Sequence, residues 1–130
     1  MTGEANCVLI VGSVALDSVE TPAGRVERAL GGAAVYSSVA ASFFAPVRLV
    51  GVVGDDFPEE HLAFLRSRGV DTRGLQIVPG KKTFHWKGAY HEDLNNAQTI
   101  RTELNVFEDF RPRLPTEYRS SKYVFLANID

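Results

Sequence analysis

Cysteine is almost absent from this 130-residue sequence, which contains only Cys7. One cysteine cannot form an internal disulfide, and its place just before the apolar run Val8–Val11 predicts a buried thiol in a reducing cytoplasm. Long apolar runs are also absent, since no stretch approaches the ~20 residues of a membrane span. The first residues, Met1–Asn6, lack the basic region of a signal peptide. We therefore expect a cytoplasmic protein without a membrane partner.

Strong charge is absent as well, because the formal net charge is −2 at pH 7 and lysine and arginine are scattered along the chain. Such a chain has no basic surface for phosphate backbones, so nucleic acid is not an expected partner. The histidines, His61, His85 and His91, lack the spacing of metal ligands, and we expect no metal site. With 45% hydrophobic and 23% charged residues, the composition is that of one folded domain, 1–130.

What the sequence does contain is a series of short apolar runs that alternate with helical patterns. Three runs predict strands buried within a sheet: Cys7–Val11, Val47–Val53 and Tyr123–Ala127. Helices are expected from Gly32 to Ala45 and from the proposed N-cap Asp56 to Gly69, with a further strand near Leu75–Val78. This order of strand, helix, strand and helix predicts an α/β fold with a parallel sheet.

Two other segments, about 14–30 and 83–107, alternate polar and apolar residues. The first predicts a small hairpin, and the second predicts two exposed antiparallel strands, Thr83–Tyr90 and Thr99–Asn105. Such half-polar strands do not fit a sheet that helices cover on both sides. We therefore expect a small separate sheet that forms a lid beside the main one.

Three aromatic residues of the predicted lid, Phe84, Trp86 and Tyr90, fall on one face of an expected strand. Aromatic rings stack on the apolar faces of sugars, so one of them could close over a bound sugar. The same rings could instead pack against the lid of a second subunit, because an exposed apolar face needs cover. Both interpretations stay open from the sequence, and the second predicts a homodimer through the lid.

Glycine-centred motifs recur at three places: Gly12–Asp17, Gly31–Ser37 and Val50–Asp56. Each lies at the carboxyl end of a predicted strand or at the start of a helix, which is the rim where open α/β sheets bind ligands. A dinucleotide site of the Rossmann type does not fit, because no further glycines follow Gly12 at the required spacing. The motifs therefore predict one crevice for a small molecule.

In this order and spacing the motifs resemble the amino-terminal part of ribokinase-like kinases, the PfkB family of carbohydrate kinases. The resemblance implies a three-layer α/β/α sheet, incomplete here, with a small antiparallel β lid. It also implies that Asp17 anchors sugar hydroxyls, that Gly31 and Gly32 let the backbone approach the substrate, and that Asp55 lies on the substrate side. Ser37 stands where the family often has Asn, so the contact there is expected to differ. A turn role for Asp17 and simple tight packing for the glycines are the alternatives.

The resemblance covers essentially the whole chain, but the late Gly-Ala-Gly-Asp run of the family, whose Asp is the catalytic base, has no counterpart here. The intact parent is then expected to use ATP and Mg²⁺ to phosphorylate a hydroxymethyl group of a sugar or nucleoside. The 130 residues alone are expected to hold no catalytic residue, to bind no cofactor and to lack kinase activity. The alternative is a non-catalytic sugar-binding or dimerisation module. The end of the chain, directly after the strand Tyr123–Ala127, favours a truncated domain.

Overall fold

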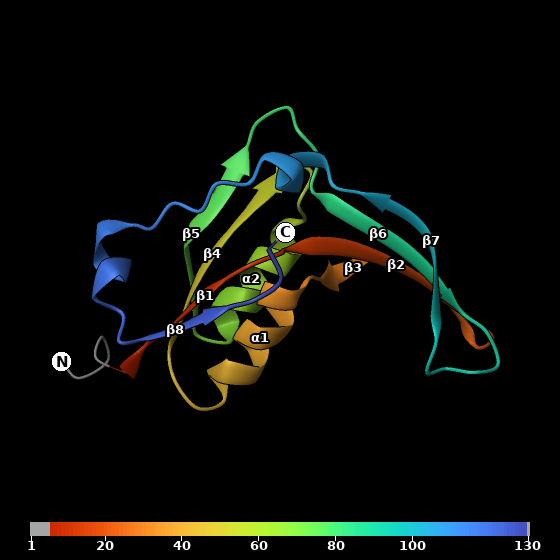
Figure 1. The fold of residues 1–130 in the computed structure, drawn as a ribbon, viewed down its shortest axis with the longest axis horizontal. Coiled ribbons are helices and arrows are strands. Elements are labelled where there is room, and N and C mark those ends of the chain that lie inside the picture. Colours follow the sequence, from red (N-terminus) through yellow and green to blue (C-terminus); the bar gives the residue numbers. More distant parts are fainter. Residues whose placement is uncertain (1–5, 130) are drawn as a thin grey trace.

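The computed structural model describes residues 6–129, which form two four-stranded sheets (Figure 1). The predictions for residues 1–5, where no signal peptide was expected, lie outside these described residues. The main sheet has the strand order β5-β4-β1-β8, and all its neighbouring strands are parallel. Its strands are β1 (Val8–Val11), β4 (Val47–Gly54), β5 (Val70–Val78) and β8 (Tyr123–Leu126). The predicted α/β fold with a parallel sheet is confirmed.

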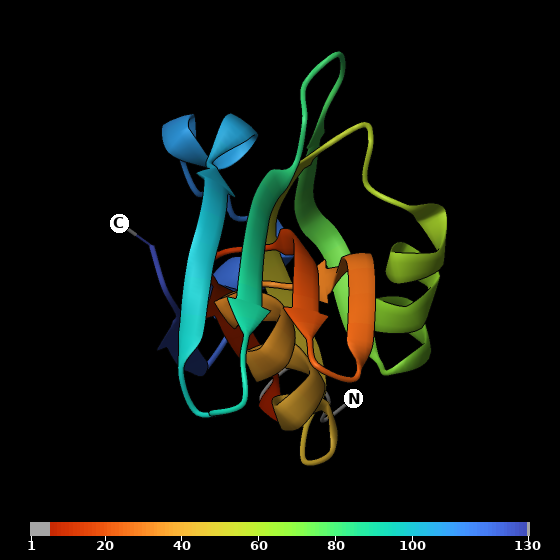
Figure 2. The ribbon, with the colours of Figure 1, turned by 90° about the vertical axis from the view of Figure 1, so that its right-hand side faces the viewer.

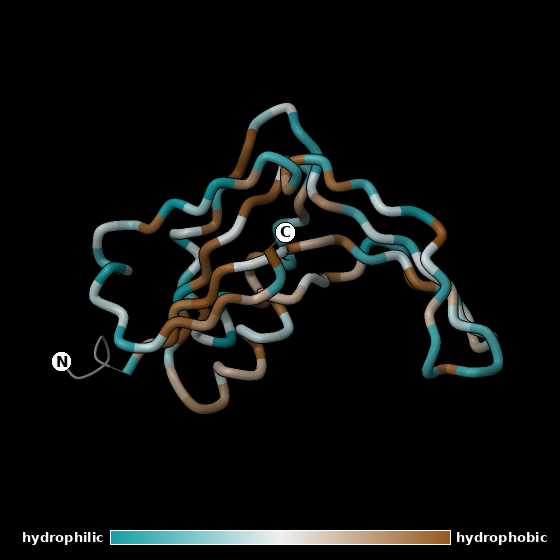
Figure 3. Tube along the Cα trace, viewed as in Figure 1, coloured by the Kyte–Doolittle hydropathy of each residue, from teal (hydrophilic) through white to brown (hydrophobic). Residues whose placement is uncertain are grey.

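The core lies between the main sheet and two helices, α1 (Ala33–Ser42) and α2 (Glu59–Ser67). Every residue of β4 is buried, as its largely apolar, valine-rich sequence predicts for a central strand. Figure 3 shows the corresponding apolar colour along β1 and β4. Helix α2 ends before Gly69, whose φ of 80° is the left-handed value that stops a helix at low cost.

The opposite face of the main sheet is covered by a coiled segment instead of helices. This segment contains two short 3₁₀ turns, η2 (Asn105–Asp109) and η3 (Thr116–Ser120). Its anchor is Tyr118, which is fully buried, donates a hydrogen bond to the Asp71 carbonyl oxygen (3.0 Å) and accepts one from the Gly74 N–H (3.1 Å). Only one of the two expected helical layers therefore occurs among residues 6–129.

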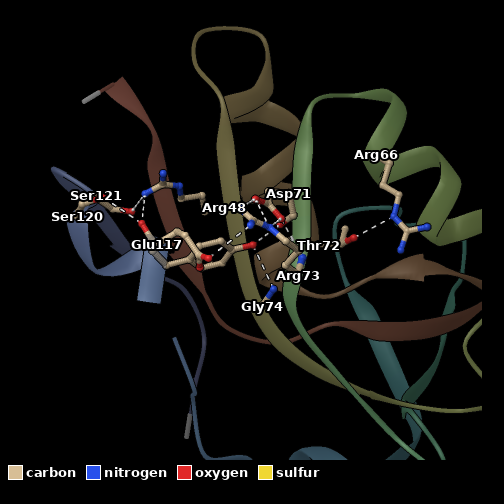
Figure 4. Close-up of polar contacts among 10 residues, drawn as sticks. Arg48, Arg66, Asp71, Thr72, Arg73, Gly74, Glu117, Ser120 and Ser121 are labelled. Atoms are coloured by element: carbon tan, nitrogen blue, oxygen red, sulfur yellow. Dashed lines mark hydrogen bonds and ion pairs between the residues drawn. The ribbon is translucent and has the colours of Figure 1, made fainter. Parts of the chain in front are cut away.

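A buried arginine fastens the same segment from the side (Figure 4). Nη1 of Arg48, on β4, donates hydrogen bonds of 2.9 Å to the carbonyl oxygen of Glu117 and to the hydroxyl of Ser121. Its guanidinium also lies 5.6 Å from the centre of the Tyr118 ring. Because the arginine's charge is buried with several acceptors around it, this strand can hold a cation inside an otherwise apolar sheet.

The second sheet, called the lid sheet here, projects from one side of the main sheet (Figures 1 and 2). Its order is β3-β2-β6-β7, with the strands β2 (Ala15–Thr21), β3 (Gly24–Gly31), β6 (Phe84–Tyr90) and β7 (Ala97–Glu103). The two hairpins are antiparallel as predicted, but β2 and β6 pair in parallel. The lid sheet is therefore mixed, because both hairpins leave the main sheet in the same direction.

Two local expectations from the sequence are wrong. Asp56 does not cap α2, whose N-cap is Pro58 without a side-chain hydrogen bond, because the Asp56 carboxylate binds Thr83 instead. Strand β8 is exposed along its whole length, although its apolar sequence predicted burial, because it lies at the sheet edge beside β1. Within the described part of the chain, no helix is long and apolar enough to cross a membrane.

Candidate substrate-binding site

The site begins where the lid sheet joins the first helix. Asp17, on β2, places its carboxylate directly over Gly31, the last residue of β3, so that a Cβ atom at position 31 would overlap it. Gly32 has a φ of 99° and packs against the backbone of Ser13. Both glycines are therefore required by close approach, and at Gly31 the group that approaches is the predicted sugar anchor itself.

The Asp17 carboxylate is half-buried and, among residues 6–129, accepts no hydrogen bond. Burial raises the pKa of Asp17, and the positive charge that His85 can carry only partly offsets this effect. A carboxylate in such a place gains from a ligand that brings hydroxyl donors. The turn role that the sequence left open does not fit, because Asp17 lies inside a paired strand.

The first backbone N–H groups of α1 already have acceptors in the loop after β1. Ser13 uses them: its hydroxyl accepts from the Ala33 N–H (2.9 Å), and its carbonyl oxygen accepts from the Ala34 N–H (2.9 Å). The loop after β1 thus satisfies the helix start. The polar group that remains available at this corner is the Asp17 carboxylate.

Tyr36 is a residue of this site that the sequence analysis missed. It lies on α1 one turn after Gly32, and 62% of its surface is exposed. Partial burial raises the pKa of Tyr36, and the negative charge of Asp17 and the phenol of Tyr90 raise it further. The spacing of four residues from Gly32 was a signal for it, because residues i and i+4 share a helix face.

Ser37 and Asp55 are not brought to Asp17. The Ser37 hydroxyl donates to the Ala33 carbonyl oxygen (2.7 Å) within its own helix, and the side chain faces an apolar groove with Phe44 and Phe125. The Asp55 carboxylate accepts a hydrogen bond from the Gly80 N–H (2.7 Å) and so shapes the turn before the lid. Their predicted substrate contacts remain predictions.

The three lid rings alternate regularly along β6, which pairs with β2 without a register shift, but they meet different neighbours. Phe84 stacks on Phe107 with the ring centres 5.2 Å apart. The indole of Trp86 lies over Gly88 and donates to the Thr99 hydroxyl (3.2 Å). Trp86 is the residue that pairs with Asp17 across β2 and β6, and the phenol of Tyr90 contributes to the raised pKa of Tyr36.

Asp56 and Thr83 fix the lid sheet to the end of β4. Oδ1 of Asp56 accepts from both the N–H (2.9 Å) and the hydroxyl (2.7 Å) of Thr83, and the Thr83 hydroxyl accepts from the Gly54 N–H (3.0 Å). Arg28, on β3, donates to the Asp56 carbonyl oxygen (2.9 Å). Both hairpins of the lid sheet are thereby hydrogen-bonded to the loop after β4. These bonds fix the position of the lid sheet, and with it Asp17 and Tyr90, relative to α1.

A sequence model described as pfkB family carbohydrate kinase matches residues 2–118. The chain belongs to this family. A cytidine kinase from Thermococcus kodakarensis is 35% identical over 124 residues, which are 94% of this chain and 43% of that protein. The resemblance seen in the sequence is thus confirmed at the level of the family.

Solved structures of other proteins have the same fold as this chain. A nucleoside kinase from Burkholderia thailandensis in complex with inosine superposes with a TM-score of 0.69 at 20% identity, over 78% of this chain and 36% of that one. The nucleoside kinase of Methanocaldococcus jannaschii, described as an archaeal member of the ribokinase family, gives a TM-score of 0.72 at 18% identity, over 95% and 45%. The pfkB chain described here therefore spans less than half the length of these relatives.

Proposed function

We propose that this chain is the amino-terminal, substrate-binding and lid portion of an ATP-dependent kinase that phosphorylates a hydroxymethyl group of a nucleoside or sugar. Family membership supports the kinase class. The observation that carries the binding role is the Asp17 carboxylate, which lies over Gly31 and accepts no hydrogen bond from residues 6–129. ATP and Mg²⁺ are the co-substrate and cation that the family implies for the complete protein.

The chain's own contribution to such a reaction is to hold the acceptor. The Asp17 carboxylate accepts hydrogen bonds from two neighbouring hydroxyls, and the lid sheet excludes water from the bound molecule. The described residues contain no group of three His, Cys, Asp or Glu side chains arranged for a metal ion. Transfer of a phosphoryl group depends on positioning and charge stabilisation of the γ-phosphate, so no chemical step is assigned to this part of the chain.

The test separates binding from chemistry. The purified 130-residue chain is expected to bind a nucleoside or ribose in a calorimetric titration and to show no ATP turnover with either in a coupled assay. ATP turnover that survives exclusion of contaminating kinases would show that this portion holds the catalytic groups. Absence of heat with every sugar and nucleoside would contradict the binding role.

A homodimer through the lid sheet is a second proposal, favoured by the exposure of its edge strand β7. Residues 97–102 of this strand are exposed, and Ile100 has 52% of its surface open. Such an edge can pair with a second copy unless a charge interrupts it. Light scattering is expected to find a dimer that Ile100→Lys converts to monomer.

The matched control for association is Phe125→Ser, because Phe125 lies on the exposed edge strand β8 of the main sheet and not on the lid sheet. This change is expected to leave the lid dimer intact. A dimer that Phe125→Ser dissociates and Ile100→Lys does not would place the contact on β8 and contradict the lid proposal.

A further inference from the structure

A β-bulge lies directly beside Asp17 in the lid sheet. The pairing of β2 with β3 shifts between Asp17 and Val19, so that two residues of β3 lie opposite Ser18. One of the two, Arg28, has a φ of 55°, the left-handed value that glycine usually supplies in a bulge. A bulge built on a non-glycine residue needs other contacts to hold it, because this conformation is unfavourable for a larger side chain.

The bulge decides which residues of β3 share a face with the Asp17 carboxylate. In the observed register Gly31 lies under the carboxylate, where any Cβ atom would overlap it. The same ladder without the extra residue would turn Arg28 and Leu30 to this face instead, because a slip of one residue reverses the side chains. Longer side chains would then cover Asp17. The opening in front of the carboxylate therefore depends on the bulge.

Ser18 and His85 hold the bulge from the opposite face of the lid sheet. The Ser18 hydroxyl oxygen accepts a hydrogen bond from the Arg28 N–H (3.1 Å) and lies 2.9 Å from Nε2 of His85. Ser18 is only 1% exposed, and among residues 6–129 the acceptor within reach of its O–H is this Nε2. The neutral imidazole therefore accepts at Nε2 and carries its hydrogen on Nδ1, which lies 3.8 Å from Oε1 of Glu103.

Protonation of His85 takes this acceptor away. Nε2 then carries a hydrogen of its own, and the buried Ser18 O–H is left without a partner, which is unfavourable. Histidine is the side chain that ordinarily changes its charge between pH 5 and 8. Charged groups of both signs surround the imidazole: Glu103 with its partner Arg101 on β7, and Arg28, Asp56 and Lys82, which border a cavity of about 190 Å³ together with His85.

We propose that His85 is a positioning residue for the acceptor substrate: through the Ser18 hydroxyl it holds the bulge that turns Gly31 toward Asp17, and its protonation weakens substrate binding. This inference rests on the proposed binding role of Asp17. Apparent affinity falls with the fraction of chains in the competent state, so binding is expected to be about 3- to 10-fold weaker at pH 5.5 than at pH 8.

Electrostatics alone predicts the opposite effect of His85. Burial raises the pKa of Asp17, and the positive charge of His85 lowers it, which keeps the carboxylate ionised at acidic pH. A variant without this charge would then lose more affinity on acidification than the wild type. The two explanations therefore differ in sign, and a comparison between variants separates them.

The experiment titrates the 130-residue chain with D-ribose and with cytidine by calorimetry at pH 8 and at pH 5.5. The fluorescence of Trp86, the only tryptophan, gives a second readout because Trp86 pairs with Asp17. His85→Gln supplies an amide oxygen as acceptor and does not titrate, so it should bind like the wild type at pH 8 and lose less affinity at pH 5.5. His85→Leu has no acceptor and should bind about 3- to 10-fold more weakly at pH 8.

The control is His91→Gln, which removes an exposed histidine whose Nε2 lies 3.1 Å from Oε1 of Gln98 and should follow the wild-type pH profile. Circular dichroism checks that each variant is folded. An acid loss in His85→Gln as large as in the wild type, or wild-type affinity of His85→Leu at pH 8, overturns the role of His85 and leaves the binding role of Asp17 standing. Failure of the wild-type chain to bind either compound at either pH overturns both.

Discussion

Replacing Tyr118 with alanine is expected to lower the free energy of unfolding by about 3–5 kcal/mol, the range found when a large buried aromatic side chain is removed. The ring is fully buried between the main sheet and the coiled segment, where Leu9, Val11 and Val50 surround it. Its loss leaves a cavity and also frees two buried backbone groups. Urea denaturation followed by circular dichroism measures the change.

The two contributions of Tyr118 can be separated. Tyr118→Phe keeps the ring but leaves the Gly74 N–H without its acceptor and the Asp71 carbonyl oxygen without its donor, so a smaller loss of about 1–3 kcal/mol is expected. Tyr123→Ala, at a half-exposed position, is the control and should cost less than either. Equal stability of Tyr118→Ala and wild type would mean that η3 does not pack on the sheet as described.

Asp17→Asn is expected to weaken binding of a nucleoside or ribose about 10- to 100-fold, since charge-assisted hydrogen bonds to the substrate hydroxyls become neutral ones. The same change should raise the melting temperature. Burial raises the pKa of Asp17 in the folded chain, so the folded state holds this proton more tightly than the unfolded state. Its contribution to stability is therefore present at acidic pH and is lost as the pH rises from the ordinary pKa of Asp through the raised one.

Glu108→Gln is the control for Asp17→Asn, because it removes a carboxylate at an exposed position outside the site. It should affect neither binding nor the melting temperature. Calorimetric titration and thermal unfolding at pH 4 and at pH 7 measure both effects. A variant that binds as tightly as wild type removes Asp17 from the site, whereas a variant that is less stable than wild type at pH 7 contradicts the burial argument alone.

The main sheet could be predicted because burial on both faces leaves a direct record in the sequence. The runs Val8–Val11 and Val47–Val53 are apolar except for Arg48, and the structure places them in the centre of the sheet. The position of Gly69 likewise marks the end of α2. The exposure of β8 could not be read in this way, because its composition alone does not say how many neighbours a strand has.

The site was harder to predict because its contacts join distant parts of the chain. Asp56 has the sequence of a helix cap, and nothing near it indicates that Thr83 supplies better donors. Tyr36 stands among small apolar residues of a helix, and its relation to Tyr90 depends on where the lid sheet comes to lie. Local patterns predict elements well, but they do not predict which side chains meet across two sheets.

The parallel pairing of β2 with β6 has a consequence for the order in which the molecule folds. Each lid hairpin consists of neighbouring residues and can form on the microsecond timescale, but the contact between the hairpins joins segments separated by α1, β4, α2 and β5. Closing so long a loop is entropically unfavourable until the intervening chain has become compact. The two halves of the lid sheet therefore come together late in folding, after the main sheet has formed around β4.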